Sequence, residues 1–444
     1  MHRQTHWGAL VRTTLAAALF TVAGAAHAAA GDLDTTFGGT GVVNVGPVVE
    51  EPIHAAAHYT HDSIVSAIVG GLPGARIATA YHTLEDGTSD AAFGSGGSTL
   101  LAGPIADDAF PYVVADKRNR IVIALVGGSV VRIYRLTTAG LPDATFGAGG
   151  VIQFAVTSSL ASTRVFTQRD RKILLVTTEH DAAFASASEL AVRRFNENGT
   201  PDATFGTGGV FRWQGPGPSN RTWGAGLGVQ ADGRVIVSGR YATGGGAYTG
   251  YVLRLTIAGT LDPTFGVAGV TSIVWTPGNL NSARDLAVMG DDRIVTGGGS
   301  YDPATAGNGA AVLARLMADG SFDATFGSGG KSIFPLPTFG GSWFSVGVAS
   351  NDKAILGGVK NESADQSQTS GNILRFRDNG VIDTAFAGDG SFEYAPTSPP
   401  FVGGGGAFLD NSDRPVGVFA QIIAPATSGN PLLVRLEAGK KSCP

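Results

Sequence analysis

The sequence predicts an all-β protein, a seven-bladed β-propeller with four antiparallel strands in each blade. A motif of a turn, an Asp, two small residues, a Phe and a Gly-rich step recurs seven times, most clearly in residues 318–330. Its Asp residues lie 56, 53, 59, 60, 61 and 60 positions apart, a period typical of repeat architectures. Short apolar segments bounded by Asp, Asn and Gly turns favour strands between the motifs, and no long segment has a helical period.

The order of elements is clearest in residues 284–334. Strands are expected at residues 284–288, 294–297, 311–316 and 330–334, with turns at residues 290–293 and 319–320. The chain starts within such a unit, with a strand at residues 41–45, and stops within one at residues 432–436. We therefore expect the two ends to share the last blade, which closes the ring and removes two exposed sheet edges.

Each motif pairs an Asp with a Phe three residues later. The pairs are Asp34/Phe37, Asp90/Phe93, Asp143/Phe146, Asp202/Phe205, Asp262/Phe265, Asp323/Phe326 and Asp383/Phe386. A basic residue stands eight positions before the Asp in six copies, and the last Arg supplies the partner of Asp34. These residues are His82, Arg135, Arg194, Arg254, Arg315, Arg375 and Arg435.

We interpret the repeated residues as structural. The Arg and Asp are expected to form ion pairs, or the Asp to accept turn amides beside the Arg, while the Phe rings wedge between blades. Seven identical acid/base sites would serve no purpose in one enzyme.

The pattern D-G-x-x-D-x-x-F-G-x-G-G-V resembles the delta-60 repeat family of bacterial exported proteins and, more distantly, NHL-type propeller repeats. The resemblance covers nearly all of the chain after residue 28. It implies a propeller fold without a settled biochemical role. Two copies depart from the pattern: Ala387 replaces the Gly after Phe386, and residues 85–87 follow an irregular third strand.

Residues 1–28 are predicted to be a Sec-type signal peptide of a periplasmic or secreted bacterial protein. Arg3 and Arg12 mark a basic start, residues 13–22 form a short apolar core, and residues 26–28 form an A-x-A cleavage site. The core is too short to span a bilayer, so no membrane insertion is expected. Residues 29–444 are predicted to be a single propeller domain.

Charge argues against nucleic acid and anionic membranes as partners. Without Arg3 and Arg12, 29 basic residues remain against 36 acidic ones, a net charge of −7, and no basic stretch stands out. Cys443 is the single Cys, so no internal disulfide forms, and its role is open. No cofactor is expected, and the oligomeric state is open.

The meander assigns the connections to two faces. Connections from strand one to two and from three to four share the short-turn face, with turns such as residues 232–233, 291–292 and 351–352. The remaining connections form the long-loop face, with variable segments such as residues 244–250, 301–308 and 361–368. Variable loops on a rigid scaffold favour ligand binding at the long-loop face.

Aromatic residues gather in or beside these variable connections. The candidate ligand-binding residues are Trp213, Trp223, Tyr241, Tyr248, Trp275, Tyr301 and Trp343. They form an aromatic platform for a sugar or peptide in one interpretation, and cap the blades to shield the core in the other.

Signals for an enzyme are weak. No G-x-S-x-G, P-loop or H-E-x-x-H motif occurs. His54 and His58 would lie about 13 Å apart on one strand, too far for one metal ion, and His61 would lie in a turn. The expected innermost strands read small and apolar, as at residues 226–229 and 286–288. A loop-borne site using Asp302, Glu362 or Asp365 stays open.

Three functions follow from the sequence. The favoured hypothesis is a binding or interaction module for a protein, peptide or glycan, which acts through the long-loop face. The second is a propeller-type hydrolase or lyase with a loop-borne site on the same face. The third is a structural component of a cell surface or matrix.

Overall fold

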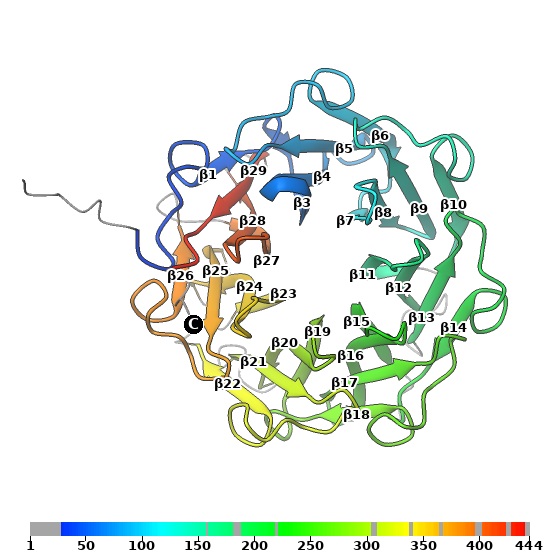
Figure 1. Ribbon diagram of the computed structural model, residues 1–444, viewed down its shortest axis with the longest axis vertical. Coiled ribbons are helices and arrows are strands. Elements are labelled where there is room, and N and C mark those ends of the chain that lie inside the picture. Colours follow the sequence, from blue (N-terminus) through cyan, green and yellow to red (C-terminus); the bar gives the residue numbers. More distant parts are fainter. Residues whose placement is uncertain are drawn as a thin grey trace, which may run out of the picture.

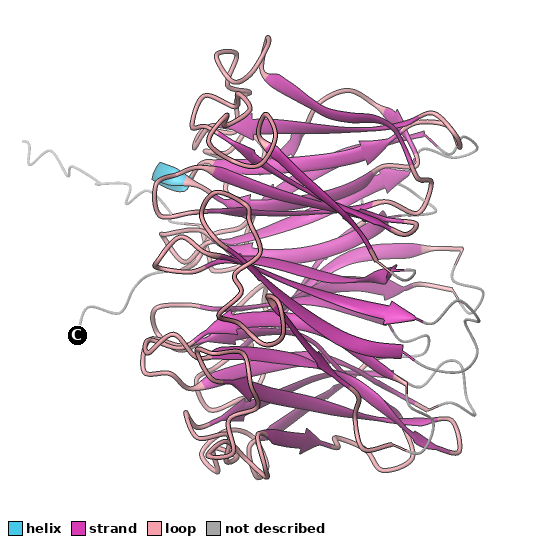
Figure 2. Ribbon diagram, turned by 90° about the vertical axis from the view of Figure 1, so that its right-hand side faces the viewer, coloured by secondary structure: helices cyan, strands magenta, loops and turns pink. Residues whose placement is uncertain are grey.

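The computed structural model describes residues 28–156, 159–180, 188–217, 221–302, 309–336, 341–363, 367–395, 402–422 and 428–439. The predicted signal peptide, apart from its last residue, and Cys443 lie outside these residues. The described chain forms strands arranged around a central axis (Figure 1), and they run between the two faces of a disc (Figure 2). Among the described residues, no helix is both long and apolar enough to cross a membrane.

Four strand positions repeat from the axis outward. The innermost strands are β3 (Ile53–His58), β7 (Phe110–Ala115), β11 (Ser159–Thr167), β15 (Thr222–Val229), β19 (Leu280–Val288), β23 (Gly341–Val348) and β27 (Val402–Leu409). The second strands are β4 (Ile64–Gly70), β8 (Ile121–Gly127), β12 (Ile173–His180), β16 (Val235–Gly244), β20 (Ile294–Tyr301), β24 (Ala354–Asn361) and β28 (Pro415–Ile422).

The outer half of the disc follows the same order. The third strands are β5 (Arg76–Thr83), β9 (Val130–Leu136), β13 (Ser188–Phe195), β17 (Ala247–Leu255), β21 (Gly309–Leu316), β25 (Thr369–Phe376) and β29 (Ser428–Arg435). The outermost strands are β6 (Ser98–Ile105), β10 (Val151–Ala155), β14 (Val210–Trp213), β18 (Val270–Ile273), β22 (Lys331–Pro335), β26 (Ser391–Tyr394) and β1 (Val42–Asn44), with β2 (Val49–Glu50) beside β29.

The all-β propeller is confirmed, but the prediction of seven separate four-stranded blades is wrong. The described strands form six hydrogen-bonded sheets. Five are single blades, four of them four-stranded and one five-stranded because β2 joins it, and the sixth is a continuous eight-stranded sheet. That sheet holds the two meanders β15–β18 and β19–β22.

Backbone pairing between β17 and β19 explains the continuous eight-stranded sheet. Tyr248 of β17 pairs in parallel with Leu280 of β19, and the Tyr248 amide donates to the carbonyl of Asn279 at 3.2 Å. The Asn281 side chain also donates to the Tyr248 carbonyl, at 3.2 Å. The Tyr248–Leu280 pairing and the Tyr248–Asn279 bond join main-chain groups next to a connection, so the side-chain pattern did not indicate them.

The ring closes where the first strand meets the last. β1 lies antiparallel to β29, with Val43 opposite Leu433, as expected from residues 41–45 and 432–436. β29 continues into β28 and β27, so one sheet combines strands from both ends of the chain (Figure 1).

The repeated Arg, Asp and Phe residues form one network in six motif copies. The Arg Nε lies 2.7–2.9 Å from an Asp Oδ2, and the guanidinium carbon lies 4.4–4.9 Å from the centre of the Phe ring. The Asp Oδ1 accepts turn amides as well, as Asp323 does from Thr325 at 3.0 Å. Both bonding patterns considered for this Asp therefore coexist.

The seven motif Phe side chains are core residues and not part of a surface site. At most 1% of the surface of each is exposed, and each belongs to a different hydrophobic cluster. A ligand on either face of the disc therefore cannot reach these rings. They are Phe37, Phe93, Phe146, Phe205, Phe265, Phe326 and Phe386.

Each motif also connects to the neighbouring unit. Arg254, for example, donates to the carbonyl of Ala318 in the next turn at 2.7 Å. Gly320 in that turn has a φ of +86°, and a Cβ there would lie 2.8 Å from the Phe265 ring. A larger residue would therefore displace either the turn or the ring. In four other copies, a Cβ added to the equivalent Gly of the neighbouring turn would lie 2.7–3.0 Å from an atom of the motif Phe ring. These rings are those of Phe93, Phe146, Phe205 and Phe326.

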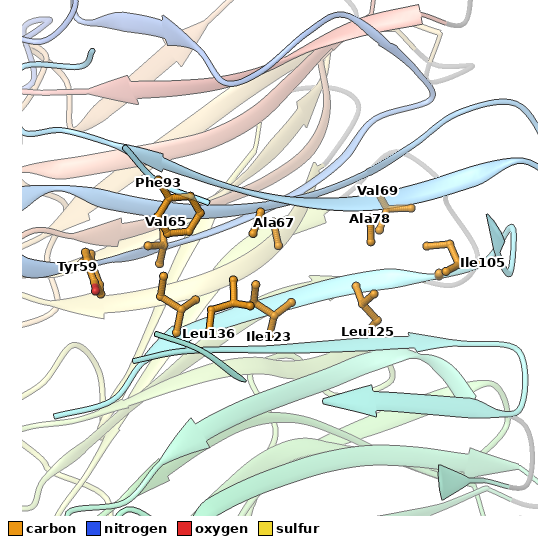
Figure 3. Packing of buried hydrophobic residues seen from close by; sticks show 13 residues of the cluster. Tyr59, Val65, Ala67, Val69, Ala78, Phe93, Ile105, Ile123, Leu125 and Leu136 are labelled. Atoms are coloured by element: carbon orange, nitrogen blue, oxygen red, sulfur yellow. The ribbon is translucent and has the colours of Figure 1, made fainter. Parts of the chain in front are cut away.

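The hydrophobic core lies between adjacent sheets. Figure 3 shows one such layer, in which Val65 and Ala67 of β4 face Ile123 and Leu125 of β8. Phe93 from the motif is buried in the same layer. The alternation of apolar residues along each strand places every second side chain in one of these layers.

Candidate functional site

The axis is crossed by a charged side chain. Arg164 of β11 donates through Nε to Asp285 of β19 at 3.3 Å, and through its terminal nitrogens to the carbonyls of Thr163 and Phe344. Asp285 also accepts the amide of Val346 in β23, at 3.0 Å. Three inner strands are thus joined through one guanidinium, which braces the centre of the disc.

Three further Arg side chains lie together and are here called the arginine cluster. They are Arg221, Arg240 and Arg284. Arg221 precedes β15, Arg240 lies on β16 opposite Trp223, and Arg284 lies at a bulge in β19. The cluster therefore lies where the eight-stranded sheet passes from one meander to the next. Arg221 and Arg240 lie on the half of their strands nearest the long-loop face, because β15 starts and β16 ends there.

Aromatic rings hold the cluster. The guanidinium carbon of Arg240 lies 4.9 Å from the Trp223 ring centre and 5.0 Å from that of Tyr248. Arg221 approaches Trp223 at 5.5 Å, and Trp223 meets Tyr248 edge to face at 5.2 Å. Cation–π contacts of this kind position a guanidinium without neutralising it.

The cluster carries uncompensated positive charge. In the part of the chain that the structure describes, none of the three side chains has an ion pair or a side-chain hydrogen bond, and Nε of Arg284 is buried without a partner. Burial, together with the positive charges of Arg284 and Arg221, lowers the pKa of Arg240 to about 10. Like charges held close together without a carboxylate attract an anion, because it relieves their mutual repulsion.

The predicted aromatic residues do not form one surface. Trp275, Trp343 and Tyr241 are buried, and the Trp275 indole donates to the carbonyl of Leu313 at 2.8 Å. Trp213 packs against Tyr251 at 4.7 Å, within the core layer of β13–β17. These contacts are those expected of aromatic residues that shield the core.

Three of the predicted aromatic residues lie at the arginine cluster. Trp223 and Tyr248 are half-buried and contact it directly. Tyr301 donates its hydroxyl to the carbonyl of Gly341, and burial raises its pKa although the charges of Arg284 and Arg240 oppose the rise.

The polar residues considered as alternatives are dispersed. Glu362 accepts from Ser370 at 2.7 Å and lies 3.1 Å from Lys360, Asp302 directly follows β20, and Asp365 lies outside the described residues. No group of three or more His, Cys, Asp or Glu among the described residues is placed to hold a metal ion.

His54 joins the first and last sheets. Its ring nitrogens lie 3.0 Å from the hydroxyl of Ser66 and 3.4 Å from the carbonyl of Phe419 in β28. Burial lowers the pKa of His54 from 6.5 to about 4. His58 lies 3.7 Å from Asp62, and His61 lies in η1 (Thr60–Asp62) on the short-turn face.

Stability is therefore expected to fall in mild acid. The unfolded chain protonates His54 near pH 6.5, whereas the folded chain resists protonation until about pH 4, so stability present above pH 6.5 is lost between these values. The loss from this residue is up to about 3 kcal/mol. Urea unfolding of wild type and His54→Gln across this range measures it, and an equal pH dependence in the two proteins would contradict the assignment.

Two clefts open on the short-turn face. One of about 840 Å³ is formed by the ends of β11, β15 and β19, with Phe166, Val229 and Val288 among its apolar lining. Some charged side chains at the rim of this cleft are paired with other side chains of the protein, since Lys172 Nζ lies 2.9 Å from Asp202 Oδ2. The other cleft, of about 510 Å³, lies beside β3–β5 and the ring closure. Both of these clefts therefore lie on the short-turn face and not on the long-loop face.

Sequence reasoning missed Arg164, Asp285 and the arginine cluster. It considered only the small, apolar parts of the expected innermost strands, at residues 55–57, 113–115, 226–229, 286–288 and 346–348. A usable signal was present: Arg284-Asp285 places two charges inside an expected inner strand, where a structural strand needs none.

Comparisons with known proteins agree with this architecture. A family model described as "Domain of unknown function (DUF5122) beta-propeller" matches residues 168–205, 230–265 and 290–326. The chain is a β-propeller repeat protein. The narrower resemblance of this propeller to delta-60 repeats remains a prediction. No curated protein matches its sequence.

Solved structures resemble the propeller at low identity. A polysaccharide lyase, an ulvan lyase bound to a GlcA(1-4)Rha3S unit, has 9% identity and a TM-score of 0.51 over 89% of this chain and 95% of the other. The polysaccharide lyase Uly1 has 9% identity and a TM-score of 0.50, with 89% and 92% covered. A protein of unknown function from Dyadobacter fermentans has 10% identity and a TM-score of 0.42, with 89% and 98% covered. These likenesses show the fold alone.

Proposed function

We propose that the protein is an exported binding module for acidic glycans, and that the arginine cluster is its binding site. The observation that carries the proposal is the set of three guanidiniums without a carboxylate partner among the residues that the structure describes, in a chain whose net charge is negative. Elsewhere in the described chain, buried guanidiniums such as Arg254 and Arg435 have an Asp at 2.9 Å or less. The cluster is therefore not part of the repeat's structural network.

The chemistry of the cluster favours carboxylate or sulfate groups. Arg donates two parallel hydrogen bonds to a planar carboxylate and binds sulfate oxygens equally well. Arg221, Arg240, Trp223 and Tyr248 each keep part of their surface exposed, and Arg221 and Arg240 lie on the half of their strands nearest the long-loop face. The Trp223 and Tyr248 rings add apolar surface of the kind on which sugar rings pack.

The likeness to the polysaccharide lyases shows the fold alone, so the proposed ligand class rests on the chemistry of the arginine cluster. One of these neighbours was solved with a ligand of uronic acid and sulfated sugar, which has the charge that the arginine cluster would accept. The proposal concerns binding and assigns no lyase activity to this chain.

Affinity electrophoresis tests the proposal with mature protein. Gels containing polygalacturonate, dextran sulfate or neutral dextran separate carboxylate binding, sulfate binding and general sugar binding. We expect retardation by at least one acidic polymer, none by dextran, and a loss of retardation as salt rises. Inorganic phosphate as competitor shows whether a free anion suffices. Equal mobility in all three gels at low salt would overturn the proposal.

A further inference from the structure

In six motif copies, a second cation contacts the motif Asp. It stands at the end of the turn from strand one to strand two, and it lies 2.9–3.8 Å from the Asp oxygen. The second cations are Arg120, Lys172, Arg234, Arg293, Lys353 and Arg414. Each of these Asp residues is therefore held by at least two positive side chains.

The unit of β3–β6 replaces both cations. His82 stands where the other copies have Arg, eight residues before Asp90. Ser63 stands where they have the second cation, because its carbonyl accepts the Tyr59 amide just as the Lys172 carbonyl accepts that of Gln168, both at 2.8 Å. Replacement of one of the two cations alone would leave a weaker ion pair at the Asp. Replacement of both creates a different hydrogen-bonded network.

The result is a chain of hydrogen bonds from hydroxyl to imidazole to carboxylate. Ser63 Oγ lies 2.9 Å from Nε2 of His82, and Nδ1 of His82 lies 2.9 Å from Oδ2 of Asp90. The hydrogen bond from His82, opposed by partial burial, lowers the pKa of Asp90, so the carboxylate stays ionised at neutral pH. An ionised Asp90 holds the proton of His82 on Nδ1 and leaves Nε2 free to accept.

This chain of hydrogen bonds borders a cleft, although only 5% of the Ser63 surface and 8% of the His82 surface are exposed. Ser63 and His82 both line the cleft of about 510 Å³, together with Thr36, Thr60 and Arg435. The turn before Ser63 contains two successive left-handed residues, His61 with φ 50° and Asp62 with φ 56°.

We propose that Ser63, His82 and Asp90 form an acyl-transfer site for short-chain carboxylic esters. Ser63 Oγ attacks the ester carbonyl while its proton passes to His82 Nε2, and the carbon–oxygen bond to the alcohol breaks as that proton moves to the departing oxygen. Water then attacks the acyl carbonyl carbon while its proton passes to His82 Nε2. The bond from that carbon to Ser63 Oγ breaks as the proton moves from Nε2 to Oγ, which releases the acid and restores both Ser63 and His82. The net reaction is ester plus water to acid plus alcohol, without a further reactant.

One competing contact defines the resting state. The Ser63 hydroxyl lies 2.6 Å from the carbonyl of Thr60, so its single proton has two acceptors. Attack requires rotation of this proton from Thr60 towards Nε2, a change of the hydroxyl torsion alone. Tyr59 meets the His82 ring edge to face at 5.1 Å and keeps the imidazole in place.

The test uses a fluorophosphonate probe and p-nitrophenyl acetate with mature protein. We expect the probe to add to Ser63, located by peptide mass, and the ester to be hydrolysed above the buffer rate. Ser63→Ala and His82→Ala should each lower that rate by about 100-fold or more. No labelling of folded wild type, or labelling only at another residue, would overturn the proposal.

A matched control comes from the chain's own repeats. The double variant Ser63→Lys, His82→Arg copies the pair Lys172 and Arg194 around Asp202, and is expected to fold with an unchanged or higher Tm. It should be neither labelled nor active. Labelling equal to wild type would overturn the assignment of Ser63. The variant lies on the short-turn face, so its glycan retardation should match wild type, which keeps this test separate from that of the proposed function.

Discussion

Arg435→Ala is expected to lower the free energy of unfolding by about 3–5 kcal/mol, because it leaves the buried carboxylate of Asp34 without its main partner. Arg435 is almost fully buried, donates to Asp34 at 2.7 Å and to the carbonyl of Glu85 at 2.6 Å, and lies 4.4 Å from the Phe37 ring centre. Urea unfolding of wild type and variant measures the change.

Two control variants separate ring closure from loss of an ion pair. Arg254→Ala removes the same network at a point where the chain is continuous, so a similar loss of stability is expected. Arg118→Ala removes an exposed pair with Glu197 and should change stability by less than about 1 kcal/mol. Only Arg435→Ala should speed hydrogen exchange in β1. A loss below about 1 kcal/mol for Arg435→Ala would contradict the closing role.

Arg240→Gln is expected to weaken acidic-glycan binding by about 10-fold to 100-fold, since a hydrogen bond to a charged group contributes about 1.5–3 kcal/mol. The same change should raise the free energy of unfolding by about 1–3 kcal/mol. Folding lowers the pKa of Arg240 from 12.5 to about 10, so the charged form is destabilised in the folded state at neutral pH. A residue that weakens its own fold is typical of a binding site.

Arg132→Gln supplies the matched control for charge. Arg132 lies on β9, outside the cluster, and donates to Gln153 at 2.9 Å. It should leave both glycan binding and stability close to wild type. Equal binding by Arg240→Gln and wild type would exclude the arginine cluster as the site, and a large loss of stability in Arg240→Gln would contradict the electrostatic argument.

The repeated motif allowed much of the fold to be predicted. The spacing of Asp and Phe, with Arg eight positions earlier, indicated the turn, its ion pair and its Phe wedge, because each is a short-range interaction. The match of residues 41–45 with 432–436 indicated closure, since each end lacked what the other supplied. The Tyr248–Leu280 pairing was missed because main-chain bonds between neighbouring sheets leave no side-chain pattern.

The candidate site was harder to predict. Arg240 lies on β16, Arg284 lies on β19 and Arg221 precedes β15, so three separate parts of the chain form the cluster and no fixed spacing in the sequence indicates it. Trp343 is buried, although its position next to a variable connection suggested a ligand surface. The departure at His82 was visible in the sequence, but its partner Ser63 was not, because its equivalence to the second cation rests on turn hydrogen bonds.

The pairing of β1 with β29 has a consequence for biosynthesis. β1 leaves the ribosome before β29, so it finds this hydrogen-bonding neighbour only after β29 has been made. Until then an unpaired strand edge persists in the nascent protein, and such edges promote aggregation. We therefore expect the growing polypeptide to depend on a holding chaperone until its final strand is available.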